Sequence, residues 1–175
     1  EGDLVLFGPD GVARCSDRGL TGKLGDAQHR GMLYLRGLGE GTILDVEDPV
    51  YGRIALEIRH IKTDVKTELR DGSPTFDIRT GVRLLMREAS GNPAEGYTDS
   101  DLARIAGLAS RAMNADMIDS IQAAGAAGSD VFGFYRYLRR GEPAYWQANS
   151  KNWHGLMAGA SYGVRVDVQV DRLGN

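Results

Sequence analysis

The side chains that most often perform chemistry are few in this sequence and are not spaced as an active site. The three histidines, His29, His60 and His154, stand far apart, and none belongs to an HExxH or other paired metal-binding motif. His60 lies in an alternating stretch that is typical of a half-exposed strand. The glycine-rich residues 37–42 lead into a predicted strand, whereas a phosphate-binding loop leads into a helix. We therefore predict neither a metal site nor a cofactor.

The remaining candidates for catalysis are one thiol and two carboxylates. The single cysteine, Cys15, permits neither an intramolecular disulfide nor a thiolate metal cluster, and its neighbours favour a small strand residue over a nucleophile. Asp116 and Asp119 are three residues apart on a predicted helix, where we interpret them as a solvated face. A hydrolase would need a constellation that these residues do not form, so we predict that the protein is not an enzyme.

The composition is that of a globular protein without a polyanionic partner. The chain has 175 residues, 42% of them hydrophobic and 26% charged, and we assign residues 1–175 to a single domain with a core of its own. A formal net charge of −3 gives no electrostatic reason to bind nucleic acid or an anionic membrane. The sequence starts at Glu1 and contains neither a signal peptide nor a transmembrane run, so we expect a soluble piece of a longer protein.

The segment 129–153 concentrates aromatic residues and carries the candidate binding surface. Seven of the thirteen aromatic side chains lie in it: Phe132, Phe134, Tyr135, Tyr137, Tyr145, Trp146 and Trp153. Short helices need large side chains to bury enough area, so we predict that three of these residues are structural anchors, namely Phe132, Trp146 and Trp153. Tyrosine and arginine are favoured at the centres of interfaces, which makes a second set the candidate partner surface: Tyr135, Tyr137, Arg139 and Arg140.

A long antiparallel hairpin is predicted from residues 51–89. Apolar residues alternate through Ile54–Ile58 and again, out of phase, through Ile61–Val65, and a β-bulge near Arg59 and His60 explains the phase change. Residues 70–73, RDGS, form a turn, after which the alternation returns. Such a pattern predicts a sheet with one face in the core and one face in water.

Shorter strands are predicted on either side of this hairpin. An N-terminal hairpin surrounds Gly8–Gly11, and residues 42–48 form a strand that Pro49 ends. Near the C-terminus, alternating valines predict a last strand through Val164–Val170.

Helical periodicity is found in three places. Residues 21–39 predict a short helix. Thr98 and Asp101 resemble a capping box, and an apolar stripe predicts a long helix from there to about Ala124: Leu102, Ile105, Ala109, Ala112, Met113, Ile118 and Ile121. A further helix is predicted from a cap at Ser129 to Gly141, and Pro143 suits the first turn of the next one.

These elements predict an α+β fold. We expect an antiparallel-rich sheet of about four strands with helices packed on one face, plus the N-terminal hairpin. The order of the strands stays open at this point.

The aromatic segment and the last strand together resemble the C-terminal region of the Ger(x)C spore-germination proteins. Nearly the whole chain follows that family's order of elements, and its last 50 residues carry the specific motifs: Asp130, Phe132–Phe134, Arg139–Arg140, Pro143, Trp146, Trp153, Val164–Val170 and Arg172–Gly174. The segment LMAGASYGV departs from the family pattern, because members commonly approach the last strand with acidic or aromatic residues and an F-P pair.

The resemblance implies a lipoprotein, the C subunit of a nutrient germinant receptor at the spore inner membrane, working with integral membrane subunits. Its lipid anchor would lie upstream of residues 1–175, on the extracytoplasmic side, because Cys15 is internal and cannot be the lipidated residue. An alternative function is a small-ligand-binding module that uses the aromatic segment 129–153 as a pocket.

Overall fold

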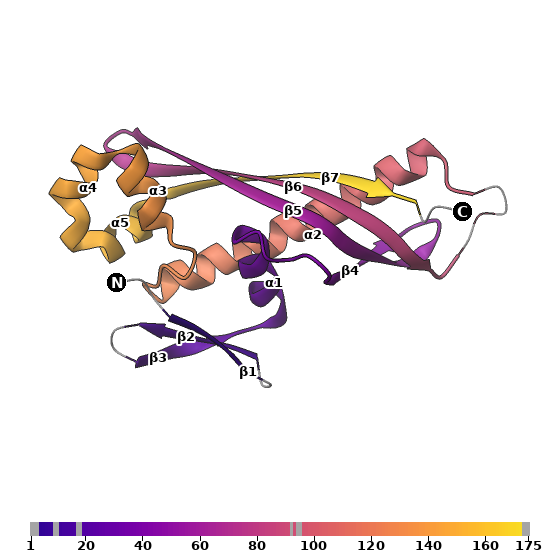
Figure 1. Cartoon of the computed structure of the whole chain (residues 1–175), viewed down its shortest axis with the longest axis horizontal. Helices are drawn as coiled ribbons and strands as arrows, with labels where there is room; N and C mark the ends of the chain where they lie inside the picture. The colour runs from indigo at the N-terminus through magenta and orange to yellow at the C-terminus, as the bar shows by residue number, and fades with distance from the viewer. Residues whose placement is uncertain (1–3, 9–10, 17–18, 92, 94–95, 173–175) are drawn as a thin grey trace.

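In the computed structural model of the chain, residues 4–8, 11–16, 19–91, 93 and 96–172 are described (Figure 1). The described elements follow in the order β1 (Leu4–Gly8), β2 (Gly11–Ser16), β3 (Gly19–Leu24), α1 (Asp26–Leu35), β4 (Ile43–Asp48), β5 (Gly52–Arg70), β6 (Ser73–Ala89), α2 (Asp99–Ala126), α3 (Phe134–Gly141), α4 (Pro143–Asn149), the 3-10 helix η1 (Ser150–Asn152), α5 (Trp153–Gly159) and β7 (Ser161–Asp171). The α+β prediction is confirmed.

The main sheet is built around the long hairpin of β5 and β6. Its strand order is β4-β5-β6-β7, and β4, β5 and β6 pair antiparallel. Asp71 and Gly72 at the hairpin turn both have positive φ, 50° and 76°, which is the backbone that a tight two-residue hairpin turn requires. The pairing shifts between Ile58 and His60, which confirms the predicted bulge, and a second shift lies between Ala55 and Leu56.

The last strand, β7, pairs parallel with β6, from Thr75 opposite Ser161 to Leu85 opposite Asp171. A parallel neighbour requires the chain to return to the start of β6 before the last strand begins. The 28 residues of α2 span about 42 Å, more than the roughly 36 Å of the 11-residue β7, so the helix can bring the chain back to the start of the β6–β7 pairing. The long helix therefore determines the direction of β7, which the pattern of the strands alone left open.

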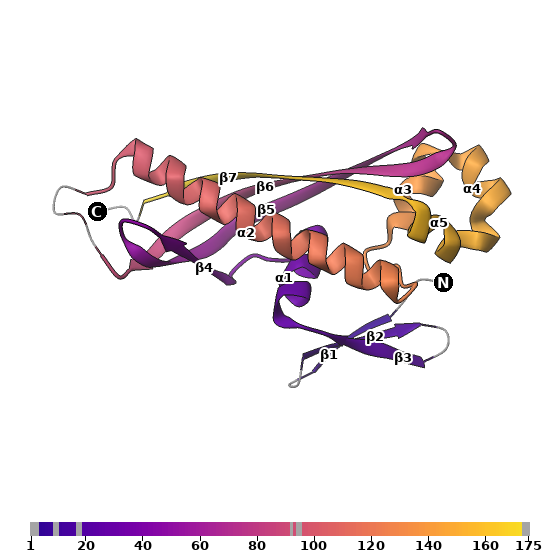
Figure 2. The ribbon, with the colours of Figure 1, turned by 180° about the vertical axis from the view of Figure 1, so that it is seen from behind.

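One face of the sheet packs against helices and the other carries charges. Figure 2 shows α2 running across the covered face, with α3, α4 and α5 at one end. The core between them contains fully buried side chains from every layer, such as Leu56, Phe76, Leu84, Ile105 and Met113. Cross-strand and neighbouring ion pairs line the open face: Arg53 with Asp45, Lys62 with Asp64, Arg83 with Asp171 and Arg165 with Asp167. The predicted division into one wet and one dry face is confirmed.

Helix α2 begins with the predicted capping box. The Thr98 hydroxyl accepts the Asp101 backbone N–H at 3.2 Å, and the Asp101 carboxylate accepts the Thr98 N–H at 2.9 Å. Its apolar stripe is as predicted except at one position: Ile118 is 38% exposed, and Met117 is fully buried in its place.

The N-terminal region contains one strand more than predicted. Strands β1 and β2 form the predicted hairpin, although Pro9 and Asp10 of its turn lie outside the described residues. Strand β3 adds to β2, so residues 21–24, which were predicted as the start of a helix, are strand, and α1 begins at Asp26. Pairing with β2 supplies hydrogen bonds that outweigh the weak helical periodicity of this stretch. The three strands form a separate small sheet beside α1 (Figures 1 and 2).

Candidate functional site

A cluster of aromatic rings fills the end of the molecule where α3, α4 and α5 pack against the sheet (Figure 1). Phe134 of α3 is 1% exposed and lies at its centre. Its ring centroid is 5.1 Å from that of Phe76 in β6, 5.2 Å from Phe132 and 5.4 Å from Tyr162 in β7. These contacts join the short helices to two strands of the sheet.

The two tryptophans extend this cluster toward solvent. Trp146 and Trp153 meet edge to face with their centroids 5.4 Å apart, and the Tyr135 ring lies 6.1 Å from Trp146. Both tryptophans and Phe132 are half-buried and pack against the core. The structure thus brings the three proposed anchors to the same end of the molecule, with part of each left in contact with water.

A buried carboxylate, Asp130, determines where α3 begins. It is 5% exposed, and its two oxygens accept the backbone N–H groups of Phe134 at 2.8 Å and Tyr135 at 2.9 Å. The cap predicted at Ser129 is wrong: Ser129 is fully buried, and the N-cap of α3 is Gly133, four residues later, whose φ of 74° is in the left-handed region. The longer Asp130 side chain reaches the free N–H groups of the first turn from outside the helix.

Two opposing effects act on the pKa of Asp130. Burial raises it, and the backbone N–H groups that it accepts and the nearby indole of Trp153 counteract that rise. The Trp153 N–H is buried, and no described residue accepts a hydrogen bond of normal geometry from it. Burial, together with the charge of Asp130, also raises the pKa of Tyr162.

The four residues of the candidate partner surface differ in their exposure. Arg139 and Arg140 are exposed, whereas Tyr135 and Tyr137 are half-buried. The Tyr137 backbone carbonyl accepts the Thr67 hydroxyl of β5 at 3.3 Å, which attaches α3 to the hairpin. The candidate set also omitted Arg136, whose guanidinium lies 5.5 Å from the Tyr135 ring centroid. Its helical spacing from Arg139 and Arg140 was the signal that could have identified it.

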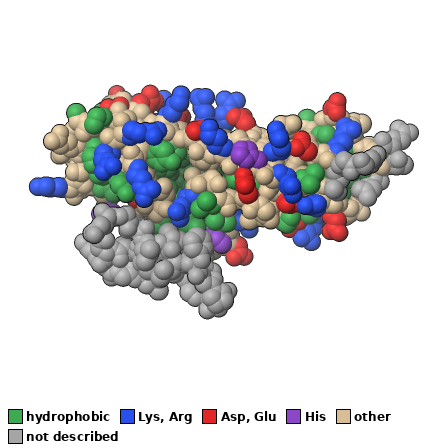
Figure 3. All heavy atoms as spheres, in the orientation of Figure 1, with side chains coloured by type: hydrophobic (Ala, Val, Ile, Leu, Met, Phe, Trp, Pro, Cys, Tyr) green, Lys and Arg blue, Asp and Glu red, His purple; other side chains and the backbone are tan. Residues whose placement is uncertain are grey.

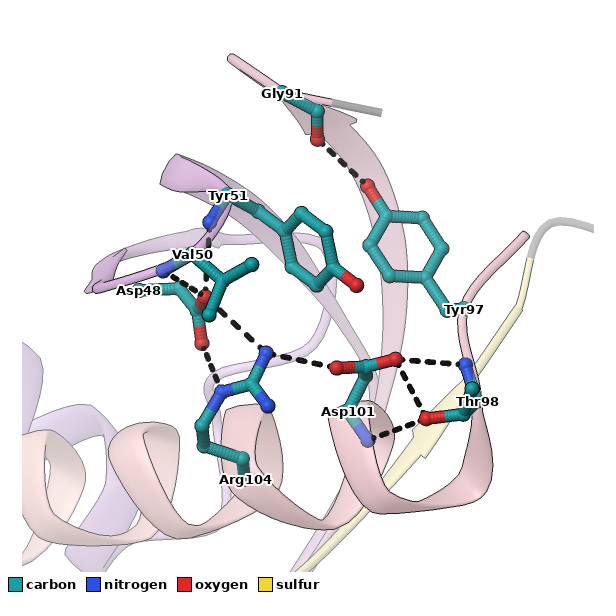
Figure 4. A network of polar contacts seen from close by, with 8 residues as sticks. All are labelled: Asp48, Val50, Tyr51, Gly91, Tyr97, Thr98, Asp101 and Arg104. Atoms are coloured by element: carbon teal, nitrogen blue, oxygen red, sulfur yellow. Dashed lines mark hydrogen bonds and ion pairs between the residues drawn. The ribbon is translucent and has the colours of Figure 1, made fainter. Parts of the chain in front are cut away.

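A second polar cluster, which the sequence did not predict, lies where α2 begins, at the end of the molecule opposite the short helices (Figure 1), and Figure 4 shows it from close by. Arg104 of α2 donates from Nε to Asp48 at 2.8 Å and from Nη2 to Asp101 at 2.9 Å. The Asp48 carboxylate also accepts the backbone N–H groups of Val50 and Tyr51, at 2.9 and 3.0 Å. The cluster fastens the turn between β4 and β5 to the start of α2, a structural role.

Hydrogen bonds within this cluster shift the pKa values of Asp48, Asp101 and Arg104 toward the charged forms. The hydrogen bond from the Thr98 hydroxyl lowers the pKa of Asp101 to about 2, with further help from the Thr98 N–H and Arg104. Burial opposes the ionisation of Asp48, but Arg104 and two backbone N–H groups still lower its pKa. The pKa of Arg104 is raised, mainly by its hydrogen bonds to Asp48 and Asp101. All three groups are therefore charged at neutral pH.

The interpretation of Asp116 as a solvated residue is wrong, because α1 crosses α2 at this position and covers it. Asp116 is 7% exposed, and its carboxylate accepts Arg30 Nε at 2.7 Å and Nη2 at 3.2 Å. Asp119 is exposed, as predicted. Because 86 residues separate Arg30 from Asp116, the spacing of the two aspartates could not reveal this pair.

The described residues contain no group of three or more His, Cys, Asp or Glu side chains able to hold a metal ion. The His60 side chain is exposed on β5, with Nδ1 2.9 Å from a Glu40 carboxylate oxygen. Residues 159–163, GASYG, match the letters of the GxSxG nucleophile motif. Ser161, however, follows α5 and is the first residue of β7, whereas the nucleophile elbow runs from strand to helix.

Among the described helices, none is long and apolar enough to cross a membrane.

Comparison with known proteins relates the chain to spore germination. The family described as "Spore germination B3/GerAC like, C-terminal" matches residues 10–174. A crystal structure of the GerBC protein has the same fold, with a TM-score of 0.84 and 15% sequence identity over 97% of this chain. The match spans 56% of that protein's chain. No similar sequence was found among curated proteins. Leu173 and Gly174, the last residues of the motif noted in the sequence, lie outside the described residues.

Proposed function

Because this chain belongs to the spore germination B3/GerAC-like family, we propose that it is the C-terminal domain of the C subunit of a nutrient germinant receptor. The observation that carries the proposal is the family match, which extends over residues 10–174. The shared fold with GerBC supports it. On this proposal residues 1–175 act as one unit that has no enzymatic role.

We further propose that the domain acts in assembly or signalling with the integral membrane subunits of the receptor. The protein would be held at the extracytoplasmic side of the spore inner membrane by a lipid anchor outside residues 1–175. Two features support a role in binding partner subunits rather than in catalysis. The polar clusters at Arg104 and Arg30 join elements of the fold, and the short helices at the other end present arginines to solvent.

The alternative function, a small-ligand-binding module, has no specific observation in its favour. The rings of segment 129–153 pack against one another and against the core, with centroids 5.2 to 6.1 Å apart. Rings that are already in contact do not leave a preformed cavity between them.

A germination experiment tests the receptor proposal. Spores that lack the full-length protein should fail to respond to nutrients, should respond normally to a trigger that does not act through nutrient receptors, and should recover when the intact protein is restored. Deletion of residues 1–175 from the full-length protein should abolish the recovery while the truncated protein stays at the membrane. A normal nutrient response in the deletion strain would refute the proposal.

Calorimetric titration of the chain with germinant amino acids and sugars tests the alternative function, a small-ligand-binding module. That function requires measurable heats of binding.

A further inference from the structure

The outward side of α3 carries three arginines. At 100° per residue, Arg136, Arg139 and Arg140 fall within one third of the helix circumference, opposite the buried Phe134 and Leu138. All three are exposed. We call this set the α3 basic face.

The three cations of the α3 basic face lie together on one side of a single helix, and all three lack ionic partners within the described structure. Arg136, Arg139 and Arg140 form no ion pair with any described residue, whereas most arginines of the open sheet face pair with neighbouring carboxylates, as Arg53 does with Asp45 at 2.8 Å. An ion pair within the domain would have to be broken before a partner could use the charge. The α3 basic face has no such cost.

The local charge is opposite in sign to that of the whole chain. Residues 131–160 contain four Lys or Arg and one Asp or Glu, while the chain has a net charge of −3. Figure 3 shows Lys and Arg side chains gathered around hydrophobic side chains on the end of the molecule formed by the short helices. Acidic side chains lie toward the upper border of that end. A basic area on an acidic protein orients an anionic partner as it approaches.

The support beneath these arginines is fixed before any partner binds. Asp130 caps the first turn of α3, and the last turn lies against β5, where a Cβ added at Gly141 would clash with the Thr67 hydroxyl at 2.2 Å. Arg136 Nε donates to the Tyr135 hydroxyl at 3.1 Å, and Tyr135 packs against Trp146. A helix held at both ends loses little conformational freedom on binding.

We propose that the α3 basic face docks an acidic, carboxylate-rich segment of a partner protein. Three planar guanidinium groups on one side of a helix match carboxylates, which they can bind through two parallel hydrogen bonds each. A membrane surface fits less well, because membrane-binding helices insert large apolar side chains. The exposed large hydrophobic residues of the described structure, Leu38, Ile43, Val50 and Ile118, all lie outside the short helices.

On the receptor proposal above, the acidic segment belongs to a membrane subunit. The surface itself is inferred from its charges and geometry, and this part of the inference does not rest on the receptor assignment.

Fluorescence anisotropy of a labelled ten-residue glutamate peptide tests the docking proposal. We expect binding that weakens as salt is added, and an affinity at least about tenfold lower for the triple variant R136Q/R139Q/R140Q. The matched control, R36Q/R79Q/R111Q, removes the same charge from three exposed arginines that lack ion pairs elsewhere, and it should bind as the wild type does. Melting curves verify that both variants fold. If the glutamine variant unfolds, R136K/R139K/R140K, which keeps the charges at the end of the helix, takes its place. The lysine variant should retain binding with an affinity reduced a few-fold.

Three results would overturn the proposal. One is equal weakening by the α3 and control variants, which would mean that only net charge matters. Another is the absence of peptide binding at low salt. The third is tighter binding to phosphatidylglycerol vesicles than to the peptide, which would assign the surface to a membrane. Spores carrying R136Q/R139Q/R140Q distinguish the docking surface from its use in the receptor. If the variant loses peptide binding but the spores germinate normally with nutrients, the α3 basic face binds acidic segments but does not act in the receptor.

Discussion

The crossing of α1 over α2 depends on a single glycine, and its replacement gives a sharp test of the packing. A Cβ at Gly31 would lie 2.0 Å from the Asp116 backbone oxygen, 2.4 Å from the Asp116 carbonyl carbon and 2.9 Å from the Met117 nitrogen. These are backbone atoms in the middle of a long helix, so they cannot turn aside as a flexible side chain would. In a Gly31→Ala variant, α1 must therefore move away from α2 by roughly 1 Å or more to restore normal contact distances.

Two opposing effects decide the outcome of Gly31→Ala. Alanine stabilises a helix interior by about 1 kcal/mol relative to glycine. Overpacking costs about 1–3 kcal/mol. The displacement also weakens the Arg30 contact to Asp116 and the 2.8 Å hydrogen bond from Ser120 Oγ to the Gln28 carbonyl, at about 1 kcal/mol each. The net expectation is a destabilisation of about 2–4 kcal/mol.

Thermal and urea unfolding followed by circular dichroism measure this change. For a chain of this size we expect the melting temperature to fall by about 5–15 °C. Gly107→Ala is the matched control, since its Cβ would meet only the end of the Arg111 side chain at 3.6 Å, an ordinary contact. That variant should be as stable as the wild type or slightly more stable. A Gly31→Ala protein that melts at or above the wild-type temperature would refute the close crossing of the two helices.

Three further predictions concern the polar clusters and the aromatic end. Arg104→Met leaves the buried Asp48 carboxylate without its cation and should lower the melting temperature by at least about 5 °C, while the double variant D48N/R104M should regain part of the loss; no recovery would contradict the pairing. Because the pKa of Asp101 lies at about 2, below its ordinary value of 3.8, its contribution to stability is complete above pH 3.8 and is lost as pH falls through 2. In urea unfolding between pH 2 and 5, Asp101→Asn should reduce the rise of stability with pH, while Asp48, whose pKa is also lowered, keeps its share. An unchanged pH dependence would exclude a contribution from Asp101. Trp153→Ala truncates a half-buried ring and should cost about 2–3 kcal/mol, whereas Trp153→Phe should cost less; equal losses would assign the effect to the indole N–H.

Features that depend on near neighbours in the chain were predictable from the sequence. The capping box of Thr98 and Asp101 spans three residues, and the hairpin turn and the bulge before His60 follow from turn chemistry and alternation. The concentration of aromatic residues identified the end of the molecule where the short helices pack. The family resemblance also came from this segment, because its motifs are local.

Contacts between distant residues were decided by the tertiary structure. Arg104 meets Asp48 across 56 positions, and Arg30 meets Asp116 across 86, so no short pattern could pair them. The parallel pairing of β7 likewise depends on where α2 returns the chain. The same applies to the candidate surface: helical spacing in the sequence places Arg136 beside Arg139 and Arg140, but only the packed helix shows that Tyr137 leans toward the core. Local chemistry determines which elements form, and the burial of their shared faces determines which charges are paired and which remain free for a partner.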